Sequence, residues 1–288
     1  MKASAAGLPM LQESRWRSLR PLIAPGALFA LFVLCGLFAP LLAPYDPSAQ
    51  DPANRLIAPS WAHLAGTDDF GRDILSRTIH GARVSLLVGV TSVMVSSFVG
   101  TALGMTMGYI GGWTEEIGLR LMDIIIAFPG IVLAIALIAA IGSGLASVVF
   151  VIALVQVPVF ARLARASVLS QLNREYVVAA RVIGASHLRV LLGHLLPNAL
   201  APTITMIGLS LADAILIEAS LSFIGLGVVP PTPTWGNILA AGRNYILLGS
   251  WWFTVVPGVA IFLTVLVVNV LADRIRDLLD PRQVLVEA

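Results

Sequence analysis

Six apolar stretches, separated by polar segments, dominate the pattern of the chain. They cover residues 22–42, 86–110, 121–141, 146–166, 199–224 and 251–272. At about 1.5 Å of rise per residue, a helix of roughly 20 residues can cross a hydrocarbon core of ~30 Å. The pattern therefore predicts an all-α integral membrane protein with six transmembrane helices.

The first apolar stretch follows a basic arm that contains Lys2, Arg15, Arg17 and Arg20, which is also the general form of a signal peptide. The stretch is longer than the apolar part of a signal peptide, and similar stretches follow it. We therefore expect a retained first helix. In the third stretch, Pro129 predicts a kink.

The polar segment 175–198, between the fourth and fifth apolar stretches, has the start and stop signals of surface helices. Asn173 can cap the first turn, and Glu175 suits a helix N-terminus. Gly184 can end the helix in a left-handed conformation. We expect a second short helix that ends at Pro197.

The first of these two predicted helices combines one apolar side with several small residues. Arg181 points away from that apolar side, which consists of Val178, Ala179, Val182 and Ile183. Another protein could approach the backbone closely at the small residues Ala179, Ala180, Gly184, Ala185 and Ser186. The segment is too polar for lipid, so we expect a docking element in water at the membrane surface.

The remaining polar segments predict a loop, an interfacial helix and a turn. Residues 43–60 are rich in Pro, Asp and Ala, residues 66–86 carry an apolar stripe beside charges, and residues 111–120 predict a tight polar turn. Asp73 and His80 could share a helix face as metal ligands. Two ligands are a weak signal, so we favour a solvated surface pair.

Composition excludes several classes of protein. The chain of 288 residues is 58% hydrophobic and 12% charged, with a mean hydropathy of +0.91, which is too apolar for a soluble domain. A net charge of +2 gives no argument for nucleic acid. Cys35 is the single cysteine, which excludes an intrachain disulfide. Lys2 is the single lysine, so no Walker A loop can form and we expect no cofactor in this chain.

The basic residues favour an orientation with both termini in the cytoplasm. Of the 18 Lys and Arg residues, only five fall in the outer segments of such a six-span chain. These five are Arg55, Arg72, Arg77, Arg83 and Arg243. The excess of positive charge on the other side predicts that segment 175–198 lies in the cytoplasm.

Two acidic residues, Asp213 and Glu218, interrupt the fifth apolar stretch. Because an ionised carboxylate is costly in lipid, both should face protein or a water-filled path. Their spacing corresponds to about 140° on a helix, so they cannot point in one direction. Either could line a path for a polar or cationic solute, or bond to neighbouring helices. We favour the second role for Glu218 and leave both open for Asp213.

Segment 175–198 resembles the EAA loop of permease subunits of ABC importers. The matching residues are Ala179, Ala180, Gly184, Leu196 and Pro197. Val178 stands where the pattern has Glu, and His194 stands at an apolar position. The resemblance implies a coupling helix that inserts into a cleft of the ATPase subunit. The residues expected to make this contact are Glu175, Val178, Ala179, Ala180, Arg181, Ile183, Gly184, Ala185 and Ser186.

Four further stretches extend the resemblance over most of the chain. Residues 66–86 fit the signature GTD-x-x-GRD-x-x-SR-x-x-x-GAR-x-SL, and residues 218–227 read EASLSFIGLG. Residues 230–239 and 271–282 are similar to the same branch. On these motifs the chain is identified as a member of the dipeptide, oligopeptide and nickel branch of ABC importer permeases, and resembles the second permease subunit.

The resemblance implies the type I ABC importer permease fold with a cytoplasmic coupling helix. It divides the chain into an N-terminal arm, first span and outer loop (1–80), a five-helix permease core (81–277) and a cytoplasmic tail (278–288). The coupling loop would occupy residues 171–197. The implied location is the bacterial plasma (inner) membrane.

The resemblance also implies partners. These are a homologous second permease, two ATP-binding subunits that hold ATP and Mg, an extracytoplasmic solute-binding protein and membrane lipid, without nucleic acid. The solute would be a di- or oligopeptide or a related small solute such as a nickel chelate. One alternative is a self-sufficient secondary transporter that uses Asp213 or Glu218. A membrane-embedded enzyme ranks last, because the four histidines are split between the two faces of the membrane.

Overall fold

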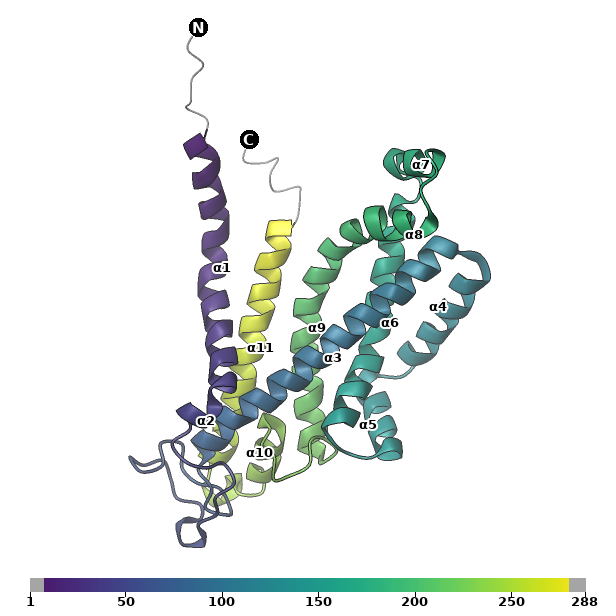
Figure 1. Ribbon diagram of the computed structural model, residues 1–288. Coiled ribbons are helices and arrows are strands. Elements are labelled where there is room, and N and C mark those ends of the chain that lie inside the picture. Colours follow the sequence, from purple (N-terminus) through teal and green to yellow (C-terminus); the bar gives the residue numbers. More distant parts are fainter. Residues whose placement is uncertain (1–7, 280–288) are drawn as a thin grey trace.

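The protein is a set of helices, most of which run between two opposite ends of the molecule (Figure 1). The computed structural model describes residues 8–279, and no β-strand occurs in that range. The longer helices are α1 (Leu8–Leu37), α3 (Ile74–Ile110), α4 (Gly112–Ile126), α5 (Gly130–Ile141), α6 (Leu145–Gln171), α9 (Leu196–Ile224) and α11 (Trp252–Leu279). The short elements are α2 (Ala39–Leu42), α7 (Glu175–Val182), α8 (His187–Val190), α10 (Trp235–Gly242), the π-helical turn η2 (Leu191–Leu195) and the 3-10 turns η1 (Pro52–Asn54) and η3 (Ile246–Leu248).

Within residues 8–279, four helices are long and apolar enough to cross a membrane: α3, α6, α11 and the continuous helix His187–Ile224 that contains α8, η2 and α9. Helices α4 and α5 qualify as a fifth span only together. The apolar part of α1, Leu22–Leu37, is shorter than a full span. The predicted all-α membrane fold is confirmed, and residues 8–279 contain four full spans, or five with the bent pair, instead of the six expected.

Helix α3 joins two predicted elements, the interfacial helix 66–86 and the span 86–110. It begins after Asp73, whose side chain accepts a hydrogen bond from the N–H of Ser76 at 2.8 Å and so caps the first turn. No proline interrupts the following 37 residues. A helix of that length extends about 55 Å, well beyond a hydrocarbon core of ~30 Å, and α3 accordingly runs obliquely across the molecule (Figure 1).

Two predictions for residues 111–141 differ from the structure: the polar turn 111–120 is shorter, and the kinked third span is two separate helices. The turn is limited to the left-handed Gly111, and residues 112–126 are the helix α4. The break comes at Pro129, where α4 and α5 are bent by 89°. Proline lacks an N–H and disfavours helical backbone at the residue before it, so the two helices separate instead of forming one kinked span.

Close packing of α3 against α6 forms the centre of the molecule. At Gly100 of α3, a Cβ atom would lie 2.6 Å from the carbonyl oxygen of Val157 and 2.7 Å from Cβ of Phe160. Glycine therefore lets the two backbones approach each other, as in other membrane helix pairs. The buried core between α3, α6 and their neighbours includes Val88, Ile152 and Phe160.

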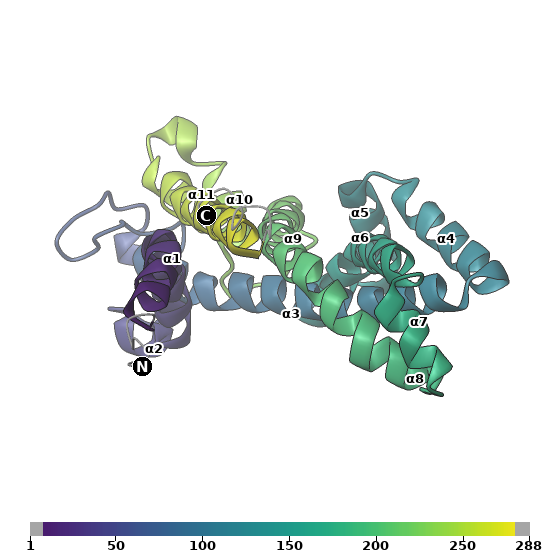
Figure 2. The same cartoon turned by 90° about the horizontal axis from the view of Figure 1, so that it is seen from above.

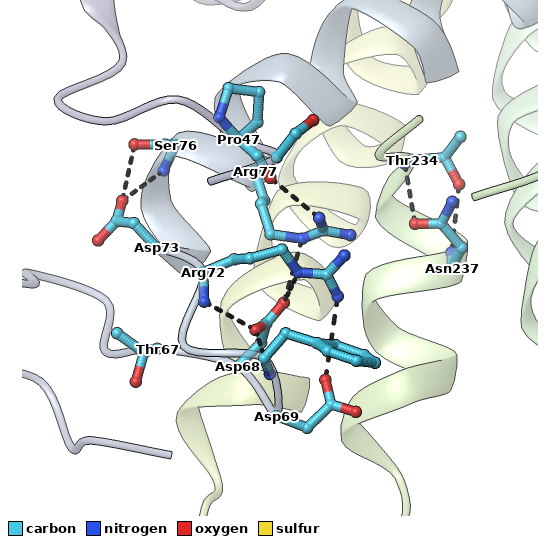
Figure 3. Close-up of polar contacts among 12 residues, drawn as sticks. Pro47, Thr67, Asp68, Asp69, Arg72, Asp73, Ser76, Arg77, Thr234 and Asn237 are labelled. Atoms are coloured by element: carbon cyan, nitrogen blue, oxygen red, sulfur yellow. Dashed lines mark hydrogen bonds and ion pairs between the residues drawn. The ribbon is translucent and has the colours of Figure 1, made fainter. Parts of the chain in front are cut away.

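The end of the molecule that carries α2 and α10 contains an outer loop, residues 43–73, held by buried charges (Figure 3). Asp68 is fully buried, and its Oδ2 lies 2.6 Å from Nε of Arg72 and 3.5 Å from Nε of Arg77. Arg77 also donates to the carbonyl of Pro47 at 3.0 Å. These contacts fasten the loop to the first turn of α3. The indole N–H of Trp252 donates to the carbonyl of Thr67 at 3.2 Å, which adds α11 to the assembly.

The predicted solvated pair of Asp73 and His80 does not form. Asp73 is buried, and its Oδ1 lies 2.9 Å from Nδ1 of His63 in the outer loop. His80 instead bonds to the carbonyl of Ser76 at 3.0 Å. The side chains described between residues 22 and 278 contain no group of three or more His, Cys, Asp or Glu that could hold a metal ion.

Candidate functional site

The docking segment, residues 175–190, consists of α7 and α8. The N-cap of α7 is Arg174, and no side chain makes a capping hydrogen bond to its first turn. The predicted cap at Asn173 is therefore wrong. Gly184 has the predicted left-handed backbone, with φ of +83°. The N–H of Ala185 donates to the carbonyl of Ala180 at 3.0 Å, and the N–H of Gly184 donates to that of Arg181 at 3.0 Å. This is the Schellman arrangement that glycine favours at a helix end.

The face of the docking segment that points away from the rest of the chain is apolar and exposed. Val182 is 80% exposed, Ile183 84% and Leu188 66%, while Val178 is also exposed. Apolar side chains this open, clustered on one short helical segment, are typical of an interaction surface. The apolar side of the predicted helix thus faces away from the rest of the chain.

Two details of the predicted contact surface need correction. Ala180 is only 6% exposed because it packs with Val177 against α6, so it offers no surface to a partner. Ala185 is half-buried. Arg181 is exposed, and its guanidinium lies 5.3 Å from the ring centre of Tyr109 in α3. The other predicted residues, Glu175, Val178, Ala179, Ile183, Gly184 and Ser186, are exposed.

The docking segment stands at the end of the molecule opposite to the outer loop (Figure 1). The first turn of α1 and the last turn of α11 lie toward the same end as the docking segment. Seen from that end, α7 and α8 project to one side of the helical body, away from α1 (Figure 2). The segment is therefore open to a partner on that side.

The predicted end of the docking region at Pro197 is wrong. Instead, α8 passes through the π-helical turn η2 into α9, and Pro197 lies in the first turn of α9. Proline has no N–H to donate to the carbonyl of Gly193 four residues earlier, and it is tolerated in a first helical turn. The widened turn immediately before it therefore connects the docking segment to α9 without a break.

Glu218 is fully buried among three helices. Its carboxylate accepts hydrogen bonds from the hydroxyls of Ser222, at 2.7 Å, and of Ser85 in α3, at 3.0 Å. The Ser85 hydroxyl in turn accepts from the N–H of Trp235 at the start of α10, at 3.3 Å. The acid thus links α9, α3 and α10, and hydrogen bonds compensate for the loss of water.

Asp213 has the opposite environment on the same helix. Its side chain is exposed, and within residues 22–278 the structure shows no hydrogen bond or ion pair to its carboxylate. Leu216 and Ser220 follow it at helical spacing and are exposed too. An apolar hollow of about 310 Å³ lies beside this face, with Leu216 and Ser220 of α9 and Leu239 of α10 among its lining.

Two tyrosines near the docking segment were not identified from the sequence as functional candidates. Tyr109, on the last turn of α3, contacts His187 of α8, and Tyr176 of α7 contacts Gln171 and Asn198. Tyrosine near the end of an apolar helix is an ordinary sign of a membrane interface. Nothing in the local pattern indicates that the partner of Tyr109 lies 78 residues away.

Comparison with known proteins agrees with this helical membrane architecture. The chain matches the family described as "Binding-protein-dependent transport system inner membrane component" over residues 100–284. Residues 19–59 match the "N-terminal TM domain of oligopeptide transport permease C". A chain of the MetNI methionine ABC transporter, solved in an inward-facing conformation, has a similar fold with a TM-score of 0.57 and 18% sequence identity. The match covers 71% of this chain and 96% of that one.

Similar sequences are named as transport permeases. The Di/tripeptide transport system permease protein DppC of Pseudomonas aeruginosa is 47% identical, covering 89% of this chain and 87% of that protein. The Glutathione transport system permease protein GsiD of Pectobacterium atrosepticum is 39% identical, covering 98% and 97%.

The apolar helices and the similar fold define a multi-pass helical membrane protein. The family match is more specific. The chain belongs to the family of inner membrane components of binding-protein-dependent transport systems, the permease subunits of ABC importers.

Proposed function

We propose that this chain forms half of the translocation pathway of an ATP-driven importer for di- or oligopeptides or a chemically related small solute. The names of the similar proteins support a peptide substrate, because they include transporters of di- and tripeptides, of dipeptides and of glutathione. Nothing in these comparisons favours a self-sufficient secondary transporter.

The exposed apolar face of the docking segment is the observation that carries this proposal. Val182, Ile183 and Leu188 would be covered by an ATPase subunit, which would hold ATP and Mg. The chain itself lacks the lysine of a phosphate-binding loop, since Lys2 is its single lysine. The complete importer would contain this chain, a homologous second permease, two ATPase subunits and an extracytoplasmic solute-binding protein.

The proposed orientation places the docking segment and both termini on the cytoplasmic side of a bacterial plasma membrane. The excess of basic residues on the inner segments supports it. The outer loop, residues 43–73, would then face the compartment that holds the solute-binding protein. This arrangement lets ATP act at one end of the permease while the solute enters at the other.

We assign Asp213 to the translocation pathway and Glu218 to the internal structure of the permease. Glu218 has its hydrogen bonds within this chain, whereas the carboxylate of Asp213 has none within residues 22–278. Leu216 and Ser220, which follow Asp213 on the same face of α9, line an apolar hollow. A carboxylate in the middle of a span is too costly to face lipid, so Asp213 would face the second permease or the water-filled path. There it would attract a cationic group, such as the N-terminal ammonium of a peptide.

Reconstitution of the whole importer in proteoliposomes tests the function. The expected result is ATP-dependent uptake of radiolabelled dialanine or trialanine that exceeds uptake of a nickel chelate. Equal uptake by this chain alone, or without ATP, would refute the proposed class of transporter. Uptake of the nickel chelate but of no peptide would refute the proposed substrate.

Asp213→Asn tests the assignment within the pathway. We expect peptide uptake to fall by about tenfold, as for the loss of one hydrogen-bonded charge pair, while the ATPase subunits still co-purify. The matched control is N-acetylated peptide, whose poor uptake should not depend on the carboxylate. Loss of ATPase binding in the variant would instead make Asp213 a structural residue.

A further inference from the structure

Tyr109 connects α3 to both helices of the docking segment. Its hydroxyl and Nδ1 of His187 in α8 share a hydrogen bond at 2.8 Å. The guanidinium of Arg181 in α7 lies 5.3 Å from the centre of its ring, within the range of a cation–π contact. Both contacts are directional, so a displacement of α7 or α8 changes the geometry around one side chain on α3.

Tyr176 makes the corresponding connection to α6 and α9. Its hydroxyl donates to Oε1 of Gln171, the last residue of α6, at 2.5 Å. The same hydroxyl accepts from the side-chain amide of Asn198, in the first turn of α9, at 3.3 Å. Its ring is also 6.3 Å from that of His194 in η2. One phenol therefore bridges the turn through which the docking segment continues into α9.

Apolar packing leaves a gap next to Tyr109. A hollow of about 610 Å³ separates the inner end of α3 from α8 and η2, with Thr106, Leu188 and Leu191 on its walls besides Tyr109 and His187. Beside this hollow, the hydrogen bond between Tyr109 and His187 joins α3 to α8, in addition to the buried cluster that contains Met105 and Val190. The Tyr109 hydroxyl therefore connects two helices at a place where apolar side chains do not fill the space between them.

We propose that Tyr109 and Tyr176 are positioning residues for energy coupling, which transmit movement of the docking segment to α3, α6 and α9. The proposal rests on the proposed function, because it assumes that an ATPase moves this segment. Neither hydroxyl belongs to the exposed apolar face formed by Val182, Ile183 and Leu188. Binding of the ATPase and transmission of its movement therefore depend on different side chains.

Tyr109→Phe and Tyr176→Phe test the proposal, singly and together, in the complete importer. Each substitution removes a hydroxyl and keeps the ring, so the fold and the docking face are retained. Tyr45→Phe is the matched control, since the Tyr45 hydroxyl donates to the carbonyl of Ala62 at 2.7 Å in the outer loop, at the other end of the molecule. Two quantities are measured: the ATPase that co-purifies, and the peptide transported per ATP hydrolysed.

Transport is measured with dialanine or trialanine, whichever the wild-type importer takes up faster. We expect Tyr109→Phe and Tyr176→Phe to bind ATPase as the wild type does. Each should transport about two- to tenfold less peptide per ATP, which is the range for one lost hydrogen bond. The double variant should show a larger loss. Tyr45→Phe should match the wild type in both quantities.

Two outcomes would overturn the inference. An unchanged ratio of peptide to ATP in the double variant would show that the hydroxyls transmit nothing. A loss of co-purifying ATPase in the inner variants would show that they merely shape the docking surface. Failure of the wild-type chain to bind any ATPase is a separate result, which would refute the proposed function itself.

Discussion

The end of the molecule with the outer loop, called the outer end, and the end with the docking segment, called the inner end, differ in where charged and apolar side chains lie. At the outer end, Asp68 and Arg77 are buried and paired with each other (Figure 3). At the inner end, Val182 and Ile183 are largely exposed on the docking segment. Charged groups of the outer loop are thus buried and paired, whereas apolar groups of the docking segment are exposed.

This difference shows which of the two features is satisfied within one chain. Buried charges are tolerated only where partners and hydrogen bonds are provided, and the outer loop provides them from α3 and its own backbone. Exposed apolar side chains gain nothing from water and are stabilised when a partner covers them. The charges of the outer loop are accordingly satisfied within one chain, whereas the apolar face of the docking segment would be covered only by a partner.

The largest expected effect comes from breaking the outer charge cluster. Asp68→Asn leaves Arg72 and Arg77 buried without their shared carboxylate, which should cost roughly 3–5 kcal/mol of folding stability. Thermal unfolding in detergent would measure the loss. The matched control is Asp277→Asn at the exposed pair with Arg274, where we expect less than about 1 kcal/mol. Equal effects at the two sites would contradict the contrast between the ends.

The next largest effect is a loss of ATPase binding at the docking segment, with no change in folding stability. Ile183→Ser removes an apolar side chain that a partner would bury, so ATPase affinity should fall by about 10- to 100-fold, from roughly 1.5–3 kcal/mol of lost burial. Unfolding of the isolated chain should not change, since the side chain is exposed. Leu247→Ser, at an exposed position in the outer region, serves as the control and should leave ATPase affinity unchanged.

Gly184→Trp should have a smaller effect on the same segment. A non-glycine residue at φ of +83° is strained by about 1–2 kcal/mol, which shifts the end of α7, and the indole would stand on the docking side. We expect ATP hydrolysis to become uncoupled from uptake while membrane insertion stays intact. Gly184→Asn is the control, because asparagine tolerates left-handed backbone. Normal coupling in the Trp variant would argue against this docking surface.

The smallest effect concerns the pH dependence of the outer end. Burial raises the pKa of the Asp69 carboxyl, and the neighbouring Asp68 charge raises it further, while Arg72 lowers it. The ionised form therefore disfavours folding above the folded-state pKa, and stability is gained as the pH falls through that pKa. Asp69→Asn should slightly raise the unfolding temperature at neutral pH and remove this dependence. A pH profile identical to that of the wild type would exclude the contribution.

The sequence by itself determined the membrane class, most of the helices and the place of the docking segment. These features depend on local physics: the length of an apolar stretch sets a span, and Gly184 ends a helix because of its own backbone freedom. The signature motifs likewise indicate the family from the sequence alone.

Only the tertiary structure decided which polar groups meet. Glu218 is paired with Ser85, 133 residues earlier, and Tyr109 with His187, 78 residues later. It also decided that Ala180 is buried and that the guanidinium of Arg181 lies against Tyr109 of α3. The physical reason is that side-chain partners are set by how the helices pack, and local spacing along one helix carries no information about a neighbour from a distant part of the chain.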